Sequence, residues 1–186
     1  MIIVDYSGIA LASIIINKTN DEQMIRHMIL NSLRMYHKRY KDVYGEMVLA
    51  VDATNNWRKK VFPQYKASRK KNRQESTFDW NEAFRLLNLV REEIAENFPY
   101  KVIRVDKCEA DDVIGTIVAS KSTIQFNVEK IMIVSSDRDF LQLQRFPNVK
   151  QFSPLLKKEL KEDNARYYLL NHIIRGDKGD GVPNIL

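Results

Sequence analysis

The sequence predicts an α/β domain built on a doubly wound, mostly parallel sheet flanked by helices. Short apolar runs alternate along the chain with longer stretches whose apolar residues recur every three or four positions. This alternation is typical of parallel strands joined by helices that cover both faces of a sheet. A length of 186 residues with 44% hydrophobic content fits one domain with a core of its own.

The first half of the chain predicts two strands and three helices. Residues 2–5 and 47–51 are continuous apolar runs of the length expected for buried strands. Residues 8–16 and 21–39 show helical spacing of apolar side chains, and so do residues 77–97, which Pro99 terminates. The expected apolar face of this third helix comprises Phe84, Leu87, Val90, Ile94 and Phe98.

The second half continues the same alternation. Its Val- and Ile-rich runs are bounded by acidic, Ser or Pro residues, as strands that lead into turns and helices usually are. The expected elements in chain order are a strand at 102–105, a helix at 109–120, a strand at 131–134, a short helix at 137–144, a strand at 149–152 and a helix at 162–175.

Acidic residues follow four of the expected strands. Asp5 and Asp52 end the first two, residues 109–112 read Glu-Ala-Asp-Asp, and Asp137 and Asp139 follow the strand at 131–134. Ligands of parallel α/β sheets bind beyond the carboxyl ends of the strands, so these acids should converge. A single acid there is often a helix cap, but pairs and triplets exceed what capping needs. Because clustered carboxylates repel unless divalent cations neutralise them, the pattern predicts a magnesium- or manganese-dependent phosphoryl-transfer site.

The acids at residues 109–112 should not all point the same way. At about 100° per residue, Glu109 and Asp112 share one side of a helix, whereas Asp111 points elsewhere unless the first turn is irregular. Asp137 and Asp139 leave their strand on a tight turn and are placed to span two ions. We therefore expect two of the three acids at residues 109–112 to bind metal.

A run rich in Gly and Asp at residues 176–184 adds two more acids near the end of the chain. Taken alone, such a run is a turn. Because it follows a predicted helix, Asp177 and Asp180 can bring ligands to the site from outside the sheet.

A strongly basic segment interrupts the alternation after Asp52. Residues 58–73 contain eight basic residues and no acidic one, and aromatic residues lie among and beside them. A charge run is usually a solvated loop, but rings beside cations can stack on bases while Lys and Arg hold phosphates. The net charge of +6, in spite of the acidic cluster, also favours a polyanionic partner. The expected nucleic-acid-binding residues are Arg58, Lys59, Lys60, Tyr65, Lys66, Arg69, Lys70, Lys71 and Arg73.

Other features point to a cytoplasmic protein without a membrane partner. The longest apolar stretch, residues 9–16, is too short to span a bilayer. The single cysteine, Cys108, cannot form an internal disulfide and is expected to be a small packed residue. The histidines at positions 27, 37 and 172 lack zinc-ligand spacing, so we interpret them as surface or helix residues.

These motifs together resemble the 5′-nuclease (flap endonuclease) superfamily, and most closely its phage ribonuclease H branch. The resemblance rests on IIVDYS, Asp52 after a strand, YKASRKKNR, EADD, SSDRDF and GDKGDGVPN, which occur in this order over essentially the whole chain. It implies a PIN-like nuclease domain at residues 1–175, with a basic arch-like insertion at residues 54–76. Residues 176–186 would begin a helix-hairpin element that grips duplex DNA.

The resemblance also implies an activity, which is metal-dependent 5′→3′ exonuclease and flap endonuclease cleavage of RNA primers and 5′ flaps during DNA replication. Its cofactors would be two Mg²⁺ or Mn²⁺ ions, and its substrates DNA and RNA–DNA with 5′ ends or flaps. Lys66 and Arg69 match the arch residues that steer the scissile phosphate. The implied metal-binding acids are Asp5, Asp52, Glu109, Asp111, Asp112, Asp137, Asp139, Asp177 and Asp180.

One departure from the family is the end of the chain at Leu186, just as the helix-hairpin element begins. The expectation is a fragment, the product of a truncated gene, or one half of a split nuclease, with a separate C-terminal polypeptide and replication proteins as partners. Two alternatives stay open. One is a PIN-type ribonuclease acting on single-stranded RNA, and the other is a truncated, non-catalytic nucleic-acid-binding protein.

Overall fold

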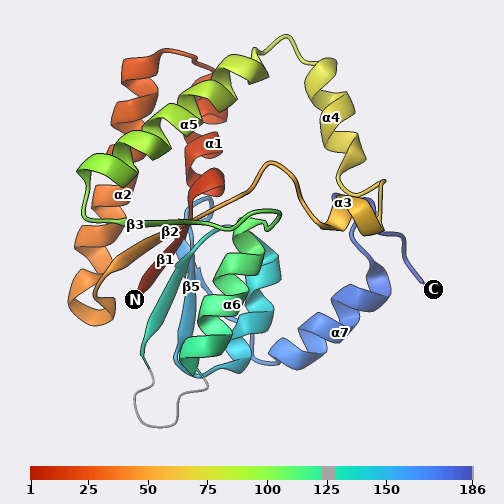
Figure 1. Ribbon diagram of the computed structural model, residues 1–186. Helices are drawn as coiled ribbons and strands as arrows, with labels where there is room; N and C mark the ends of the chain where they lie inside the picture. Colours follow the sequence, from red (N-terminus) through yellow and green to blue (C-terminus); the bar gives the residue numbers. More distant parts are fainter. Residues whose placement is uncertain (123–128, 186) are drawn as a thin grey trace.

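The computed structural model describes residues 1–122 and 129–185, and its centre is a six-stranded mixed sheet (Figure 1). The strand order is β3-β2-β1-β4-β5-β6, with every neighbouring pair parallel except β5 and β6. The strands are β1 (Ile2–Asp5), β2 (Met47–Val51), β3 (Lys101–Arg104), β4 (Ile131–Val134), β5 (Val149–Ser153) and β6 (Lys158–Leu160). The predicted fold class is confirmed.

The strand order indicates where on the sheet a ligand would bind. From β1 the chain adds β2 and β3 on one side of the sheet, and later β4 and β5 on the other. The direction of winding therefore reverses between β1 and β4, and ligands of doubly wound sheets bind beside the carboxyl ends at such a point. Asp5 ends β1 there, and Asp137 follows β4 after Ser135 and Ser136.

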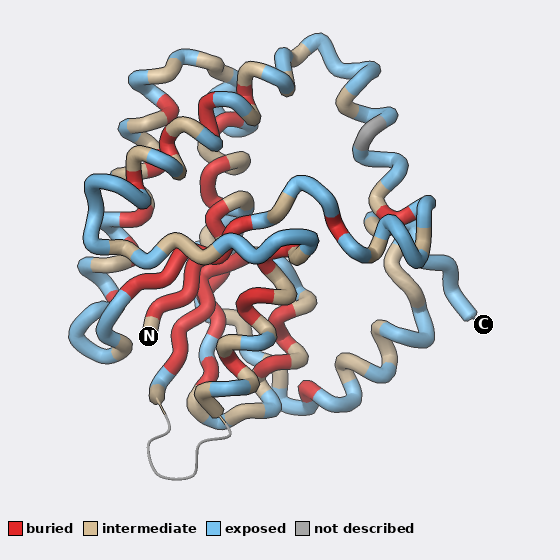
Figure 2. Tube along the Cα trace, in the orientation of Figure 1, coloured by how far each residue is buried: buried red, intermediate tan, exposed pale blue. Residues whose placement is uncertain are grey.

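Two hydrophobic cores lie on opposite faces of the sheet. Helices α1 (Tyr6–Asn17), α2 (Glu22–Tyr44) and α5 (Trp80–Asn97) cover one face, and α6 (Ala110–Ser122) with the 3-10 helix η1 (Arg138–Arg145) covers the other. Because side chains alternate along a strand, Ile2 and Val4 enter the first core and Ile3 enters the second. Figure 2 shows the buried residues gathered in the sheet and the inner sides of these helices.

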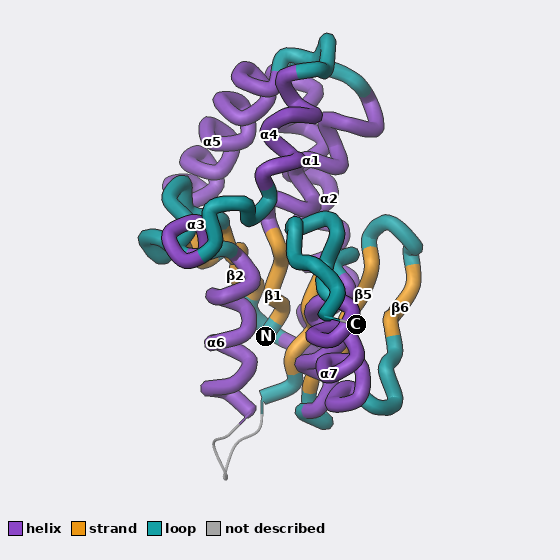
Figure 3. The backbone as a smooth tube through the Cα atoms, turned by 90° about the vertical axis from the view of Figure 1, so that its right-hand side faces the viewer, coloured by secondary structure: helices purple, strands orange, loops and turns teal. Residues whose placement is uncertain are grey.

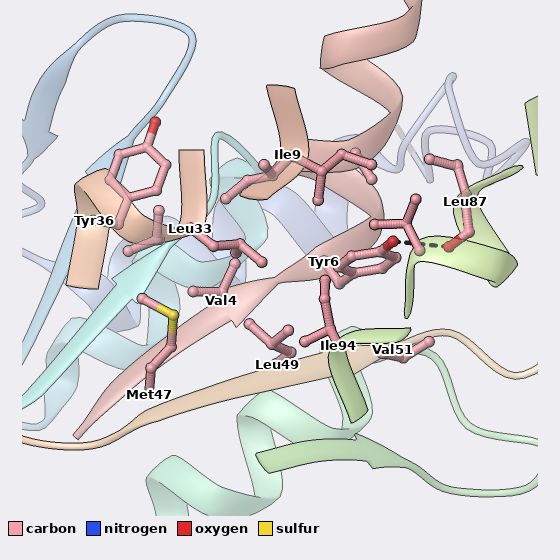
Figure 4. Close-up of a cluster of buried hydrophobic side chains, with 14 of the residues drawn as sticks. Val4, Tyr6, Ile9, Leu33, Tyr36, Met47, Leu49, Val51, Leu87 and Ile94 are labelled. Atoms are coloured by element: carbon pink, nitrogen blue, oxygen red, sulfur yellow. Dashed lines mark hydrogen bonds between the residues drawn. The ribbon is translucent and has the colours of Figure 1, made fainter. Parts of the chain in front are cut away.

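The first core fixes the start of α1 beside the sheet (Figure 4). Tyr6 follows Asp5 directly, and its ring is buried while its hydroxyl donates a hydrogen bond of 2.8 Å to the Leu87 carbonyl oxygen of α5. Val4 and Ile9 pack in the same cluster. This packing holds the end of β1, and with it Asp5, in a fixed position.

The helices agree with the predicted positions but differ at their ends. Helix α2 continues to Tyr44 instead of residue 39, because Tyr40 packs in the core before Gly45 ends the helix at a φ of 77°. Helix α5 begins at Trp80 because Asp79 caps it. Phe98 does not join the apolar face of α5, since the backbone is already extended there and the side chain is 39% exposed.

The predicted set of strands lacked β6. This strand is three residues long, reads Lys-Glu-Leu, and pairs antiparallel with β5 at the edge of the sheet (Figure 3). Charged residues on a short edge strand discourage pairing with other chains, and they also remove the apolar pattern that marks a strand in sequence.

The basic segment and the end of the described chain lie away from the sheet. The basic segment forms two helices, α3 (Arg58–Val61) and α4 (Ala67–Gln74), and the chain then crosses to α5 (Figure 1). Helix α7 (Ala165–Arg175) packs against η1 and leads to residues 176–185, which return toward α3. Within residues 1–122 and 129–185, no helix is both long and apolar enough to cross a membrane.

Candidate metal centre and nucleic-acid interface

Asp5 is held by its neighbours on both sides. It is the last residue of β1 and the N-cap of α1, so its Oδ1 accepts a hydrogen bond of 3.0 Å from the Gly8 amide. Its Oδ2 accepts a hydrogen bond of 3.0 Å from the Ser135 hydroxyl, which follows β4. A Cβ atom at position 8 would lie 2.7 Å from Asp5 Oδ2, so the space for this carboxylate depends on glycine.

Asp52 and Asp137 also accept hydrogen bonds from backbone amides at the start of helical elements, but only Asp137 caps the element that follows it. Asp52 Oδ1 accepts from the Ala110 amide at 2.8 Å, which ties the end of β2 to the start of α6. Asp137 Oδ1 accepts from the Asp139 amide at 2.9 Å and starts η1. The capping role weighed from the sequence is therefore present, and it orients these acids toward the carboxyl ends of β1, β2 and β4.

Asp111 joins Asp5, Asp52 and Asp137 to form the sheet-end group. Burial, followed by the charges of Asp5 and Asp137, raises the pKa of Asp111 to about 8. Burial and the charges of Asp52 and Asp137 raise the pKa of Asp5 to about 6, against the opposing hydrogen bonds from Gly8 and Ser135. Asp5 and Asp111 are therefore each buried beside other carboxylates of the group, whose charge opposes their ionisation.

The orientation of residues 109–112 differs from the expectation in one respect. Glu109 and Asp112 do lie on one side, since the Glu109 amide donates to Asp112 Oδ2 at 2.9 Å. Both of these acids face the basic segment, however. Asp111 is the acid of this stretch that lies with the other members of the sheet-end group. The reason is that Glu109 precedes α6, so helical rotation counted from it does not locate the sheet.

Glu109 and Asp112 anchor the basic segment through short polar contacts. The Arg58 guanidinium forms a bidentate pair with Asp112, with both N–O distances 2.8 Å. Glu109 accepts from the Tyr65 hydroxyl at 2.7 Å and from Lys66 Nζ at 2.8 Å. Burial alone would raise the pKa of Glu109, but the Lys66 and Tyr65 hydrogen bonds outweigh it and hold this pKa below its usual value.

Asp180 pairs with the same segment from the end of the chain. Its Oδ1 lies 2.7 Å from Arg69 Nη2, its Oδ2 lies 3.7 Å from Lys66 Nζ, and its carbonyl oxygen accepts from the Lys66 amide at 3.0 Å. Three of the nine candidate metal ligands, Glu109, Asp112 and Asp180, are thus paired with cations of the basic segment in this conformation.

Asp139, Asp177 and His172 form a separate group, which we call the η1–α7 group. His172 Nε2 lies 3.3 Å from Asp139 Oδ1 and 3.9 Å from Asp177 Oδ2. Each residue of this group offers one possible ligand atom, and the three atoms all lie within 4.8 Å of one another. Among the described residues, no other three or more His, Cys, Asp or Glu side chains come together in this way. His172 lies in α7 and is 35% exposed, in agreement with its interpretation as a surface or helix residue, but its place beside two acids left no signal in the sequence because those acids lie outside α7.

The basic segment faces the sheet-end group across a cleft of about 650 Å³. Acids from the sheet ends line one side of the cleft, and Lys59, Lys66, Arg69 and Arg73 line the other. Lys59, Lys60 and Lys71 are exposed, so they can reach a polyanion. The Lys70 side chain lies outside the described residues.

Two of the expected nucleic-acid contacts have other roles in this conformation. The Tyr65 ring is only 7% exposed and its hydroxyl is bonded to Glu109, so it supports the acid and offers no face to a base. Arg58 is committed to Asp112 and lies over the Trp57 ring at 4.8 Å. Trp57, which directly precedes the basic segment, is 44% exposed.

The chain is similar to known proteins over almost its whole length. Residues 3–169 match the family model described as 5′-3′ exonuclease, N-terminal resolvase-like domain. The chain is 39% identical over 194 residues to ribonuclease H of Enterobacteria phage T4, and the match covers 98% of this chain and 62% of that protein. It is 24% identical over 177 residues to a 5′-3′ exonuclease of Buchnera aphidicola, covering 91% of this chain and 57% of that protein.

Solved structures from phage T5 share the fold. A T5 5′-exonuclease with divalent zinc ions bound matches with a TM-score of 0.80 at 18% identity, covering 100% of this chain and 69% of that one. A T5 flap endonuclease in a pseudo-enzyme–product complex with DNA and metal ions matches with a TM-score of 0.77 at 20% identity, covering 99% and 69%. The chain spans less than two thirds of the length of the phage T4 and Buchnera proteins described above.

Proposed function

We propose that this chain, which belongs to the 5′-3′ exonuclease family, acts as a metal-dependent 5′→3′ exonuclease and flap endonuclease. The observation that carries the proposal is the sheet-end group of four carboxylates facing a basic cleft at the switch point of the sheet. Substrates with a phosphate backbone fit the cleft, and divalent cations fit the acids. RNA primers and 5′ flaps arising in DNA replication are the proposed substrates.

The residues present fit two divalent ions, which we propose to be Mg²⁺ or Mn²⁺. Carboxylate oxygens are the ligands that both ions accept, and the pKa of Asp111 is raised first by burial and then by neighbouring carboxylates, whose charge a cation would relieve. The sheet-end group would hold one ion, and Asp139 with Asp177 would hold the other. When bound, the ions would activate a water molecule and neutralise charge on the scissile phosphate.

The chain's own residues would position the substrate. Lys66 and Arg69 line the cleft opposite the sheet-end group, where negative charge develops on a phosphate during cleavage. Lys59, Lys60 and Lys71 are exposed along the same segment and would bind phosphates further from the reacting bond. Glu109 and Asp112 fix the segment through Lys66 and Arg58, so they act here as positioning residues.

A cleavage assay tests the proposal. The chain should cleave 5′-flap DNA and a 5′ RNA primer on DNA with Mg²⁺, and EDTA should stop the reaction. Asp137→Asn should lower turnover by orders of magnitude, whereas Asp106→Asn is the matched control, since that side chain is 80% exposed and pairs only with its neighbour Lys107 in the described contacts. Preferred cleavage of single-stranded RNA would instead favour a PIN-type ribonuclease, and binding without cleavage would favour a non-catalytic protein.

A further inference from the structure

We propose that His172 is a nitrogen ligand of the second cation and makes that position select Mn²⁺ or Zn²⁺ over Mg²⁺. The inference deepens the proposed function and rests on it, because it concerns an ion of the same site. Its observation is the η1–α7 group, in which an imidazole nitrogen and two carboxylate oxygens lie within 4.8 Å of one another.

The three ligands come from different parts of the chain. Asp139 lies in the first turn of η1, His172 in the last turn of α7, and Asp177 just after α7 ends. The side chains are 38%, 35% and 34% exposed, respectively, so an ion and its water molecules can reach them. They open onto a cavity of about 590 Å³ that Asp111 also lines. The group is therefore accessible and adjoins the sheet-end group.

The position of the His172 ring is fixed by its surroundings. It stacks on Tyr168, one turn earlier in α7, with ring centres 6.1 Å apart and planes 7° from parallel. The chain then reverses at Gly176, whose φ is 68° and where a Cβ would overlap the carbonyl oxygen of Pro183. This reversal, closed by the paired backbone bonds between Asp177 and Val182, brings the Asp177 carboxylate back toward the imidazole.

The ligand chemistry of the two positions differs. Asp5, Asp52, Asp111 and Asp137 offer oxygen atoms, which suit Mg²⁺. At the η1–α7 group, an imidazole beside two carboxylates favours ions that accept nitrogen, such as Mn²⁺ and Zn²⁺. We therefore expect the two positions to differ in selectivity, with the nitrogen ligand as the cause. The simpler alternative is that His172 only forms an ion pair with Asp139.

Electron spin-echo spectroscopy with Mn²⁺ separates the two explanations. A ¹⁴N coupling from a directly bound imidazole should appear when Mn²⁺ is added to the whole chain. The coupling should vanish in His172→Gln and persist in His37→Gln, the control, whose ring packs edge-on against Tyr100 away from the acids. Weaker Mn²⁺ binding in His172→Gln, by about tenfold, should accompany a much smaller change for Mg²⁺.

Three outcomes have defined meanings. Absence of the ¹⁴N coupling in the unmodified chain, or its persistence in His172→Gln, overturns the inference. To separate loss of the ligand from misfolding, the thermal unfolding midpoint of His172→Gln in EDTA must match that of the unmodified chain, and His172→Asn serves as a second variant. A ¹⁴N coupling without any Mg²⁺-dependent cleavage would leave the His172 ligand standing and would overturn the proposed nuclease function alone.

Discussion

At the scale of single residues, the absence of a side chain at Gly8 leaves the space that the Asp5 carboxylate occupies. An Ala side chain there would place its Cβ 2.7 Å from Asp5 Oδ2 and displace the carboxylate. The gain of about 1 kcal/mol in helix propensity should roughly offset the loss of the Asp5 cap, so the free energy of unfolding in EDTA should change little. Mn²⁺ affinity, measured by titration, should nevertheless fall by about tenfold or more for Gly8→Ala.

Gly115 provides the matched control for this substitution. It also lies inside a helix, but a Cβ there would meet no heavy atom within 4 Å among its surroundings. Gly115→Ala should raise the free energy of unfolding by about 0.5–1 kcal/mol and leave Mn²⁺ affinity unchanged. Equal Mn²⁺ affinities for Gly8→Ala and Gly115→Ala would show that position 8 does not control the Asp5 carboxylate.

Asp111 should make the metal-free protein sensitive to pH. Its pKa is raised from 3.8 to about 8, chiefly by burial, so the folded protein keeps a proton that the unfolded chain releases. The stabilisation linked to that proton is fully present below about pH 4 and is lost as the pH rises to about 8. In EDTA, Asp111→Asn should therefore be more stable than the unmodified chain at pH 8, by on the order of 2 kcal/mol, with a much smaller difference at pH 5.

Urea unfolding at the two pH values measures this difference. Excess Mg²⁺ at pH 8 should reverse the order, because an ion that binds only the folded protein stabilises the unmodified chain by mass action. A stability difference that is the same at pH 5 and pH 8 would contradict the assignment of the raised pKa to Asp111.

The sequence predicted which acids lie at the strand ends better than it predicted where their side chains point. Asp5, Asp52 and Asp137 follow strands, so their convergence could be predicted from strand-helix alternation alone. The roles of Asp111 and Glu109 depend on where α6 begins, and helix ends are poorly determined by local pattern. His172 could not be recognised at all, because it meets Asp139 only after α7 packs on η1.

At the scale of elements, the basic segment divides into anchoring and exposed cations. Arg58, Lys66 and Arg69 pair with acids from other parts of the chain. Lys60 and Lys71 are exposed, and in the described contacts Lys71 pairs only with Glu75, one turn later, at 3.8 Å. Lys60→Ala and Lys71→Ala should weaken binding to single-stranded DNA and reduce the slope of log affinity against log salt by about 1 each. Lys66→Ala should lower the cleavage rate more than the affinity.

Fluorescence anisotropy at several salt concentrations, together with single-turnover cleavage, measures both effects. Lys150→Ala is a suitable control, since Lys150 is a similarly exposed lysine on β5 that pairs with Glu159. If Lys60, Lys66 and Lys71 variants all changed affinity alone and to the same extent, the segment would be a nonspecific electrostatic surface.

Helices α3 and α4 were missed in the sequence for one physical reason. Strands β1, β2 and β4 are buried on both faces and show continuous apolar runs, so their positions were predicted correctly. Helices α3 and α4 have almost no apolar face, and they are held by ion pairs to Glu109, Asp112 and Asp180. Such long-range polar contacts leave no periodic pattern in the local sequence.

At the scale of the whole molecule, the basic segment acts as a set of internal counterions. Arg58, Lys66 and Arg69 neutralise Glu109, Asp112 and Asp180, which lie just before α6, in its first turn, and near the end of the described chain, respectively. Divalent ions attracted to the neighbouring sheet-end group would compete with these basic side chains for the carboxylate oxygens that the side chains now contact. Metal binding and the docking of the basic segment are therefore expected to oppose each other.

Hydrogen exchange can detect this opposition directly. Adding Mn²⁺ should increase amide exchange in residues 62–74, where the Lys66 amide bonds to the Asp180 carbonyl oxygen, relative to EDTA with KCl at matched ionic strength. Peptides from the core of α2, such as residues 25–36, should show no change because this buried stretch makes no contact with the basic segment in the described interactions. Unchanged or greater protection of residues 62–74 with Mn²⁺ would mean that ions and basic segment occupy separate oxygens. Increased exchange would mean that the ion displaces the chain's own cations, which frees them to bind phosphate.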